Sequence, residues 1–355
     1  MKKFRIILLV FNIIAALGLI ATTLAGAISP SSSILPSILA YGFLPMLLLN
    51  VVLALVWLFM GRWEFLVSAG TILIRFSYIG LFFQIGGTSE VPSREEHPHL
   101  ISLLSYNLHN FGGNGFESTP QDTNALLFLD LVREEQPDLL CLQEYVAVKG
   151  LNVTDSLTVM GYNHFYGSRG NESKPSGTVV FSKIPITYVK RIDQQKVLVE
   201  LMKDDRRFRL CCVHMDSYAF SLDEREDIDQ LRHGKLDSSS RHTLSKGKET
   251  VLKHEEEWLN HLCPLVRDCS IPLIFAGDMN DIPSSWLYSQ ITDYLEDTYR
   301  DEGSGFGTTY NGSFPRFRID MVFRSKEFTT LSYRRIHTDI SDHYPVLVSL
   351  ELDSE

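Results

Sequence analysis

The sequence predicts a chain in two parts, with N-terminal transmembrane helices followed by a globular α/β (α+β) domain that has a core of packed β-sheets. Three observations support this fold class. Residues 1–83 contain only six charged side chains, although 21% of the whole chain is charged. Residues 97–355 have an ordinary composition and are numerous enough to bury one large core. Within them, short β-rich runs outnumber helical stretches, which favours a sheet-on-sheet core flanked by helices over a doubly wound parallel sheet.

Three apolar segments precede the globular part. Residues 4–28 and 34–60 are each long enough, at ~1.5 Å per residue, to cross a bilayer core of ~30 Å. Residues 65–85 are a third candidate, but Arg75 near their centre makes insertion costly, so a re-entrant or interfacial segment is the alternative. We therefore expect a membrane anchor of about three transmembrane helices over residues 1–85.

Basic residues set the expected orientation of this anchor. Three cations lie within the first five residues, and Arg62 lies between the second and third segments. The positive-inside rule then places the N-terminus in the cytoplasm, and three crossings place the globular domain outside it. If the third segment does not cross, the domain faces the cytoplasm instead. The polar residues 86–98 are expected to form a linker, followed by a single globular domain over residues 99–355.

The globular part is acidic. The chain has 43 Asp and Glu against 33 Lys and Arg, and residues 1–96 hold more basic than acidic side chains, so the acidic excess lies in the globular part. An acidic domain gains little counterion-release affinity for duplex nucleic acid. This argues against a DNA-binding module, but it leaves open a nuclease that relies on metal ions.

The five cysteines do not indicate a disulfide framework. Cys141, Cys211 and Cys212 lie in apolar, strand-like runs, where we interpret them as core residues. Cys263 and Cys269 could pair in an oxidising compartment, although two unbonded thiols are the favoured interpretation. No spacing of cysteines and histidines typical of a zinc site occurs.

Apolar runs and one helical pattern alternate through the globular part. Residues 100–108 predict a buried strand, and a helix with Phe128 and Val132 on its apolar face follows and ends before Pro137. Residues 246–262 predict an amphipathic helix that covers a sheet, whereas the polar residues 217–244 predict a mobile loop. Further strands are expected at residues 138–143, 178–182, 197–201, 207–213, 273–276, 319–323 and 345–350.

Polar side chains recur where the predicted strands end. They are Asn107, Glu144, His214, Asp278, Asn280, Asp320, Asp342 and His343. Singly, each could be a turn cap or a solvated strand end. Together they supply hard oxygen ligands for Mg²⁺, amide donors for a phosphoryl oxygen, and carboxylates and imidazoles that move protons. Those groups are what the hydrolysis of a phosphate ester needs.

Seven sequence blocks carry these residues in order: SYNLHNF (105–111), PDLLCLQE (137–144), GTVVFSKIPI (177–186), VHMDSY (213–218), AGDMN (276–280), RIDMVF (318–323) and SDHYPV (341–346). Together they resemble the endonuclease/exonuclease/phosphatase superfamily, over nearly all of residues 100–350. The resemblance implies a DNase I-like fold, a four-layer sandwich with two packed central β-sheets and the active site at one edge. It also suggests a membrane-anchored bacterial type, with a multi-pass anchor in the cell (inner) membrane.

The resemblance also implies a role for each residue. Glu144 is similar to the principal Mg²⁺ ligand, and Asn107 and Asp342 would complete the shell of the ion directly or through water. Mn²⁺ is the alternative cation. These three residues form the predicted metal site.

The remaining residues resemble the reacting groups of the superfamily. Asp278 would position or deprotonate water, and Asn280 would donate to a non-bridging oxygen. His343 pairs with Asp320, which fixes its tautomer and favours the imidazolium. His214 resembles the histidine that steadies the phosphate or protonates the leaving group. Which histidine acts as acid and which as base stays open.

The sequence therefore predicts a Mg²⁺-dependent phosphoester hydrolase, either a phosphodiesterase or phosphatase or a nuclease, tethered to the membrane. The alternative is a catalytically inactive, membrane-tethered interaction protein with the same fold, and the presence of every expected polar group argues against it. A zinc phosphatase is disfavoured because the 11 histidines are scattered. The short linker keeps the domain near the bilayer, which favours a lipid headgroup or another small phosphoester over duplex DNA. Nucleic acid stays possible as a substrate, and no protein partner can be inferred.

Overall fold

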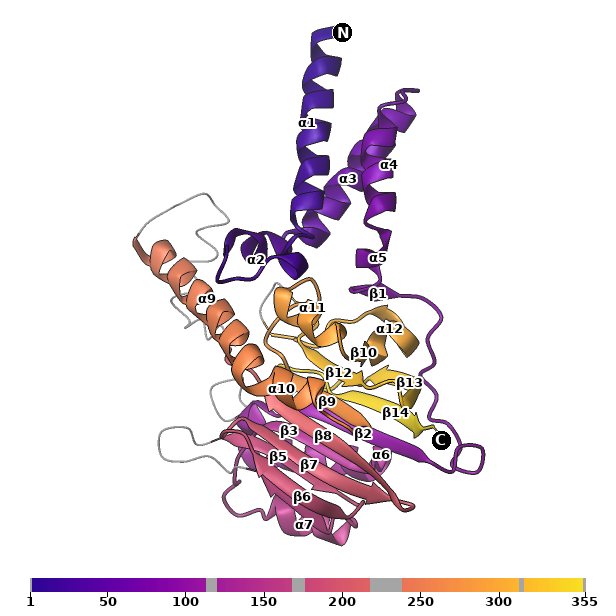
Figure 1. The fold of residues 1–355 in the computed structure, drawn as a ribbon, viewed down its shortest axis with the longest axis vertical. Helices are drawn as coiled ribbons and strands as arrows, with labels where there is room; N and C mark the ends of the chain where they lie inside the picture. The colour runs from indigo at the N-terminus through magenta and orange to yellow at the C-terminus, as the bar shows by residue number, and fades with distance from the viewer. Residues whose placement is uncertain (1, 113–119, 168–175, 218–237, 313–315, 354–355) are drawn as a thin grey trace. The chain divides into compact units, whose positions relative to one another are not determined.

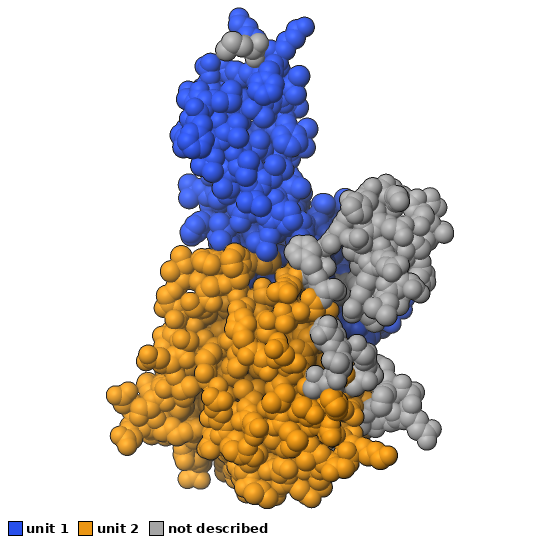
Figure 2. Space-filling view, turned by 180° about the vertical axis from the view of Figure 1, so that it is seen from behind, with its two compact units in different colours: residues 1–81, 216–262, 281–293 blue, residues 82–215, 263–280, 294–355 orange. Residues whose placement is uncertain are grey.

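The computed structural model describes residues 2–112, 120–167, 176–217, 238–312 and 316–353. The chain forms two compact units (Figure 2). The first comprises residues 1–81, 216–262 and 281–293, and the second comprises residues 82–215, 263–280 and 294–355. The predicted domain boundaries after residues 85 and 98 remain predictions.

One six-stranded sheet of the second unit contains the first strands of the globular part. Its strand order is β13 (Phe328–Arg335), β14 (Val346–Leu352), β2 (Leu100–Asn107), β3 (Leu139–Tyr145), β5 (Gly177–Ser182) and β4 (His164–Gly167). Strands β2 and β3 are parallel, and the other neighbours are antiparallel. Every residue of β2 and β5 is buried, which explains why both strands are mainly apolar and contain no charged residue.

The other six-stranded sheet has the order β10 (Glu296–Asp297), β12 (Asp320–Arg324), β9 (Leu273–Asp278), β8 (Arg206–His214), β7 (Lys196–Lys203) and β6 (Ile186–Arg191). Only β8 and β9 are parallel neighbours among the described strands of this sheet. Their register pairs His214 with Asp278, and the antiparallel register of β12 with β9 pairs Asp320 with Asp278. Three predicted site residues therefore lie in one row across three strands.

The two sheets pack against each other through one apolar core. Its side chains come from both sheets, and Leu103, Val348, Val199 and Ala276 are among them. The outer face of the first sheet carries a second core beneath α6 (Gln121–Glu135) and α7 (Val153–Val159) (Figure 1). Each fully buried Leu or Val stabilises the fold by roughly 1.5–3 kcal/mol. The prediction of two packed sheets with flanking helices is confirmed.

The cysteine interpretation needs a correction. Cys141 on β3 and Cys212 on β8 form a disulfide that links the two sheets, whereas Cys211, Cys263 and Cys269 are free. The two bonded residues lie in the core, as expected. Their pairing was missed because residues 71 positions apart come together only when the sheets pack face to face.

The second unit is completed by short elements. These are β1 (Phe83–Gln84), which pairs with β11 (Gly305–Phe306), and the helical segments η2 (His109–Gly112), α10 (Cys263–Arg267) and α12 (Thr298–Glu302). Arg318 and Asp297 form an ion pair at 2.7 Å in which both side chains are buried, and the guanidinium also lies 4.5 Å from the centre of the Tyr299 ring. This buried ion pair connects Asp297, at the start of α12, to the chain before β12.

The first unit contains the N-terminal helices and two later segments. Its helices are α1 (Lys2–Ala21), η1 (Ala25–Ala27), α2 (Leu35–Ala40), α3 (Phe43–Phe59), α4 (Phe65–Ile74), α5 (Phe76–Ile79), α9 (Ser238–Glu257), the π-helical turn η3 (Trp258–Leu262) and α11 (Trp286–Thr292). The amphipathic helix expected at 246–262 is thus present as α9 and η3. Residues 238–244, expected in a loop, belong to α9, and the rest of that loop, residues 218–237, lies outside the described residues.

Among the described residues, α1 is the one helix long and apolar enough to cross a membrane. The second predicted span is divided into α2 and α3, and α3 has 17 residues. The third predicted span is divided at Arg75 into α4, with 10 residues, and the one-turn α5. The prediction of three spanning helices is therefore not confirmed.

Helices α1, α3 and α4 bury polar side chains among apolar ones and expose large apolar side chains. Ser68 donates to Asn12 and to Asn50, and Asn50 donates to the Ala15 carbonyl at 3.0 Å. All three polar side chains are buried. Large apolar side chains on the same helices are exposed, including Ile7, Ile14, Leu48, Phe59, Leu73 and Ile74. Leu19, Leu53 and Trp57 are also buried, so the exposed apolar surface, rather than the interior, differs from that of a water-soluble helical bundle.

Candidate active site

The carboxyl ends of the two parallel strand pairs bring the predicted residues together. Asn107 ends β2 and Glu144 lies near the end of β3, while His214 and Asp278 end β8 and β9. Asn107 Nδ2 donates to Asp278 Oδ2 at 2.9 Å and lies 3.4 Å from Glu144 Oε1. One amide therefore links the polar ends of strands from different sheets.

Three sites of unusual backbone conformation support this arrangement. Glu144 has a φ of 50° at an irregularity in the pairing of β3 with β5, and Asn280 has a φ of 46°. Such left-handed conformations cost of order 1–3 kcal/mol in residues other than glycine, so the surrounding structure must hold them. Gly277 has a φ of 140°, and a Cβ there would lie 1.9 Å from the Val213 carbonyl oxygen. Only glycine therefore fits just before Asp278.

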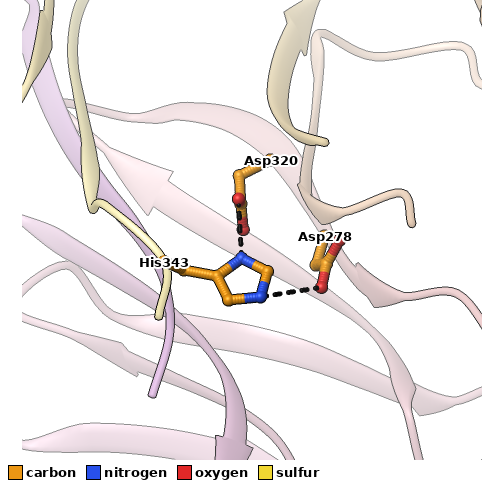
Figure 3. A group of neighbouring side chains, drawn as sticks. All are labelled: Asp278, Asp320 and His343. Atoms are coloured by element: carbon orange, nitrogen blue, oxygen red, sulfur yellow. Dashed lines mark hydrogen bonds and ion pairs between the residues drawn. The ribbon is translucent and has the colours of Figure 1, made fainter. Parts of the chain in front are cut away.

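His343 and Asp320 form the predicted pair. Nδ1 of His343 lies 2.8 Å from Asp320 Oδ2, and its Nε2 lies 3.9 Å from Asp278 Oδ2 (Figure 3). Burial opposes the charged imidazolium, but attraction to Asp320 and the hydrogen bond with it outweigh burial and raise the pKa of His343 to about 10. Both interactions with Asp320 favour the imidazolium form of His343, in which Nδ1–H donates to Asp320.

Asp278 occupies the centre of the cluster. Burial and then repulsion from Asp320 raise the pKa of this carboxyl above its usual range, although the neighbouring imidazoles and the Asn107 amide act in the other direction. Its Oδ1 accepts from the Asn280 backbone N–H at 2.8 Å. The side-chain Nδ2 of Asn280 donates to the Met215 carbonyl at 2.9 Å and lies 3.2 Å from Asp278 Oδ2. Asn280 thus orients Asp278 as well as lying beside it.

His214 faces the carboxylates of both sheets. Its Nε2 lies 3.7 Å from Glu144 Oε1 and 3.7 Å from Asp278 Oδ2. The imidazole is buried, and within the described ranges its Nε2 has no hydrogen-bond partner. A buried polar atom without a partner at a site of converging charges is suited to contact a ligand.

The structure adds two residues that sequence reasoning missed. Asn110 Nδ2 donates to Glu144 Oε2 at 3.0 Å, and His109 Nδ1 lies 3.1 Å from Asp342 Oδ1. Burial opposes ionisation of Asp342, but the interactions with His109 and His343 hold the pKa of Asp342 below its usual range. His109 and Asn110 lie in the SYNLHNF block, directly after β2, and their position after a strand end was the available signal.

The donor set is suited to a divalent cation. Glu144, Asp278, Asp320 and Asp342 converge, and their ion-pair partners in the described part of the chain are the histidines at 109, 214 and 343. Lys and Arg are absent from this set of described partners, so a bound cation would balance the excess negative charge. Carboxylate and amide oxygens are the ligands that Mg²⁺ prefers.

Ligand atoms of Asp278, Asp320 and His343 lie within 4.8 Å of one another and could themselves hold a metal ion. His343 contacts Asp320 through Nδ1, as metal-ligating histidines commonly contact a carboxylate, which leaves Nε2 as its ligand atom. Glu144, Asn107 and Asp342 are the ligand set that the sequence predicts. Their roles remain predictions.

Comparison with known proteins agrees with the fold. Residues 104–343 match the model of the Endonuclease/Exonuclease/phosphatase family, and residues 5–82 match a domain of unknown function (DUF8431). The crystal structure of ANGEL2, described as a 2′,3′-cyclic phosphatase, is 18% identical with a TM-score of 0.51 and covers 72% of this chain and 96% of its own. This similarity supports the fold alone.

Two further solved structures have TM-scores of 0.49. The human Nocturnin catalytic domain with bound sulfate is 17% identical and covers 74% of this chain and 99% of its own. An endonuclease/exonuclease/phosphatase from Beutenbergia cavernae DSM 12333 is 18% identical and covers 72% of each chain. No curated protein matches the chain.

Proposed function

The chain belongs to the endonuclease/exonuclease/phosphatase family, whose members are phosphoester hydrolases, and from this premise we propose that it is a divalent-metal-dependent phosphodiesterase or phosphatase tethered to a membrane. One observation carries the proposal. Asn107, a proposed metal ligand on one sheet, donates a hydrogen bond to Asp278, a proposed proton-transfer residue on the other sheet. The proposed metal site and the proposed proton-transfer residues are therefore adjacent.

Glu144, Asn107 and Asp342 would hold the cation, for which we propose Mg²⁺, with Mn²⁺ as the alternative. When bound, a hard cation polarises a phosphoryl oxygen and stabilises the negative charge that develops there. Asn110 and His109 orient Glu144 and Asp342, respectively, through the contacts of 3.0 and 3.1 Å.

The side chains around Asp278 would handle the proton and the phosphate. Asn107 and the Asn280 backbone hold the two oxygens of Asp278, so that this carboxylate can orient an attacking water molecule. Asp320 keeps the proton of His343 on Nδ1, and the positive imidazolium attracts a phosphate oxygen. His214 Nε2 is placed to donate to the phosphate or to the leaving group.

The polarity of α1, α3 and α4 supports membrane attachment. Exposed Ile and Leu side chains on the outside, with Asn and Ser hydrogen-bonded inside, suit contact with lipid acyl chains better than contact with water. We propose a multi-pass anchor in a bacterial cell membrane. The Cys141–Cys212 disulfide supports a catalytic domain outside the cytoplasm, because disulfides persist mainly in oxidising compartments.

Proximity to the membrane and the acidic charge of the chain support a lipid headgroup or another small phosphoester as substrate over duplex DNA. The test uses the full chain in lipid nanodiscs. Initial rates are measured on bis-p-nitrophenyl phosphate, phospholipid vesicles, inositol phosphates, RNA and plasmid DNA, with Mg²⁺ or with EDTA. The matched control is Glu144→Ala.

We expect Mg²⁺-dependent turnover that EDTA and Glu144→Ala both abolish, with lipid or small phosphodiester cleaved faster than DNA at physiological salt. A far higher rate on plasmid DNA would contradict the substrate preference. A folded protein with no rate above that of Glu144→Ala on any substrate would instead favour the inactive interaction protein.

A further inference from the structure

His254, a buried residue of α9, contacts two other segments of the first unit. His254 Nε2 lies 2.7 Å from the Asp216 carbonyl oxygen, and its Nδ1 lies 3.6 Å from Asp281 Oδ2. The His254 side chain is only 1% exposed. Lys253 adds a longer contact, with Nζ 4.0 Å from Asp216 Oδ2. One imidazole therefore joins the chain segment after β8 to the segment after β9.

Both contacted residues are covalent neighbours of the candidate active site. Asp216 follows Met215, and Asp281 follows Asn280. The Met215 backbone N–H donates to the Asp278 carbonyl at 2.9 Å, and its carbonyl accepts from Asn280 Nδ2 at 2.9 Å. Because Asn280 has a positive φ, its conformation depends on support from the chain on either side. His254 supplies that support to both segments at once.

Glu255 extends the same connection to the loop after α1. Its carboxylate accepts from the Ser31 backbone N–H at 2.7 Å, from the Ser31 hydroxyl at 2.9 Å and from the Ser29 hydroxyl. The residue is buried. Three donors from one loop therefore satisfy a carboxylate that burial alone would destabilise.

We infer that His254 is a positioning residue for phosphoester hydrolysis, and that Glu255 makes its position depend on the loop formed by residues 29–31. The inference rests on the proposed function and goes beyond it, because it gives the N-terminal segment a part in the reaction rate in addition to attachment. His254 acts through Asp216 and Asp281, which adjoin Met215 and Asn280.

The test compares four variants of the full chain in nanodiscs. His254→Leu removes the donor at similar volume, and His254→Gln keeps an N–H that can reach the Asp216 carbonyl. Glu255→Gln removes the negative charge that the Ser29 and Ser31 donors stabilise. Glu256→Gln is the matched control, because Glu256 is exposed on the same helix. Each variant is assayed for kcat and KM on bis-p-nitrophenyl phosphate, for thermal unfolding, and for amide hydrogen exchange.

His254→Leu is expected to lower kcat by about tenfold or more with little change in KM, because displaced reacting groups slow chemistry more than binding. His254→Gln should recover kcat to within about threefold of wild type, and Glu255→Gln should lower it by about threefold while Glu256→Gln has no effect. Hydrogen exchange should increase in peptides that cover residues 212–217 and 278–283 in His254→Leu.

Wild-type kcat and exchange in a folded His254→Leu would overturn the positioning role. Equal rates in Glu255→Gln and Glu256→Gln would overturn the dependence on residues 29–31. If His254→Leu does not fold, Glu255→Gln decides, since it keeps the volume of the side chain: a kcat equal to that of Glu256→Gln would overturn the inference. If the wild-type chain hydrolyses none of the substrates, the proposed function fails, and the exchange measurement still tests whether His254 holds the two segments.

Discussion

Replacing His343 and Asp320 by alanine, singly and together, tests whether the two side chains act as a unit. Nδ1 of His343 lies 2.8 Å from Oδ2 of Asp320, and both side chains are buried. Oδ1 of Asp320 has no hydrogen-bond partner among the described residues. His343 is thus the partner on which the Asp320 charge depends. Loss of either residue leaves the other without its orientation and without its charge partner.

The expected magnitudes follow from this geometry. Each single alanine variant should lose about 10²- to 10⁴-fold in kcat, the range for a positioned acid–base group. His343→Ala should also lower the free energy of unfolding by about 3–5 kcal/mol, because it leaves a buried carboxylate unpaired. If the pair acts as a unit, the double variant should lose no more kcat than the worse single variant.

Initial rates with bis-p-nitrophenyl phosphate and urea unfolding of all four proteins provide the measurements. The matched control is a second histidine–carboxylate pair, which His97 forms with Glu351. Nδ1 of His97 lies 2.6 Å from Oε2 of Glu351, and neither residue is a predicted site residue. Replacing that partly buried pair should change kcat by less than about twofold, since its residues are not among the described partners of the candidate site residues. A double variant that loses the product of the two single losses would refute the reasoning.

Three further predictions concern the metal, the disulfide and the buried ion pair. Glu144→Gln should lose activity mainly through weaker Mg²⁺ binding, because the amide keeps the shape and removes the charge; a titration with Mg²⁺ should restore part of the rate, and wild-type activity at low Mg²⁺ would exclude the ligand role. Thiol titration of the denatured chain should find three reactive thiols before reduction and five after it, and five before reduction would argue against the Cys141–Cys212 bond. Asp297→Ala should lower the free energy of unfolding by about 3–5 kcal/mol in a urea titration, because it leaves Arg318 charged in the core, and a loss below ~1 kcal/mol would show that water reaches the guanidinium.

The strand-end residues could be predicted because the end of an apolar run is visible in the sequence. His214, Asp278 and Asp320 each stand at such a point, and the observed registers place them in one row. Several strands could also be anticipated, since fully buried strands such as β2 are mainly apolar.

Other features depend on contacts that no local pattern encodes. The Cys141–Cys212 bond depends on how two sheets face each other, and the contacts of Asn110 and His109 depend on a left-handed turn with φ values of 54° and 45°. The division of the second apolar segment at Gly42 likewise breaks a run that hydropathy treats as continuous. In each case tertiary packing decides the outcome.

The hydrogen bond from Asn107 to Asp278 affects when the candidate active site forms during folding. It connects residues 171 positions apart, and the two parallel strand pairs that carry them belong to different sheets. Contacts of such high sequence separation form late, after the entropy of closing a long loop has been lost. An intermediate in which only one sheet has formed holds half of the reacting groups, so recovery of activity on refolding should lag behind recovery of secondary structure.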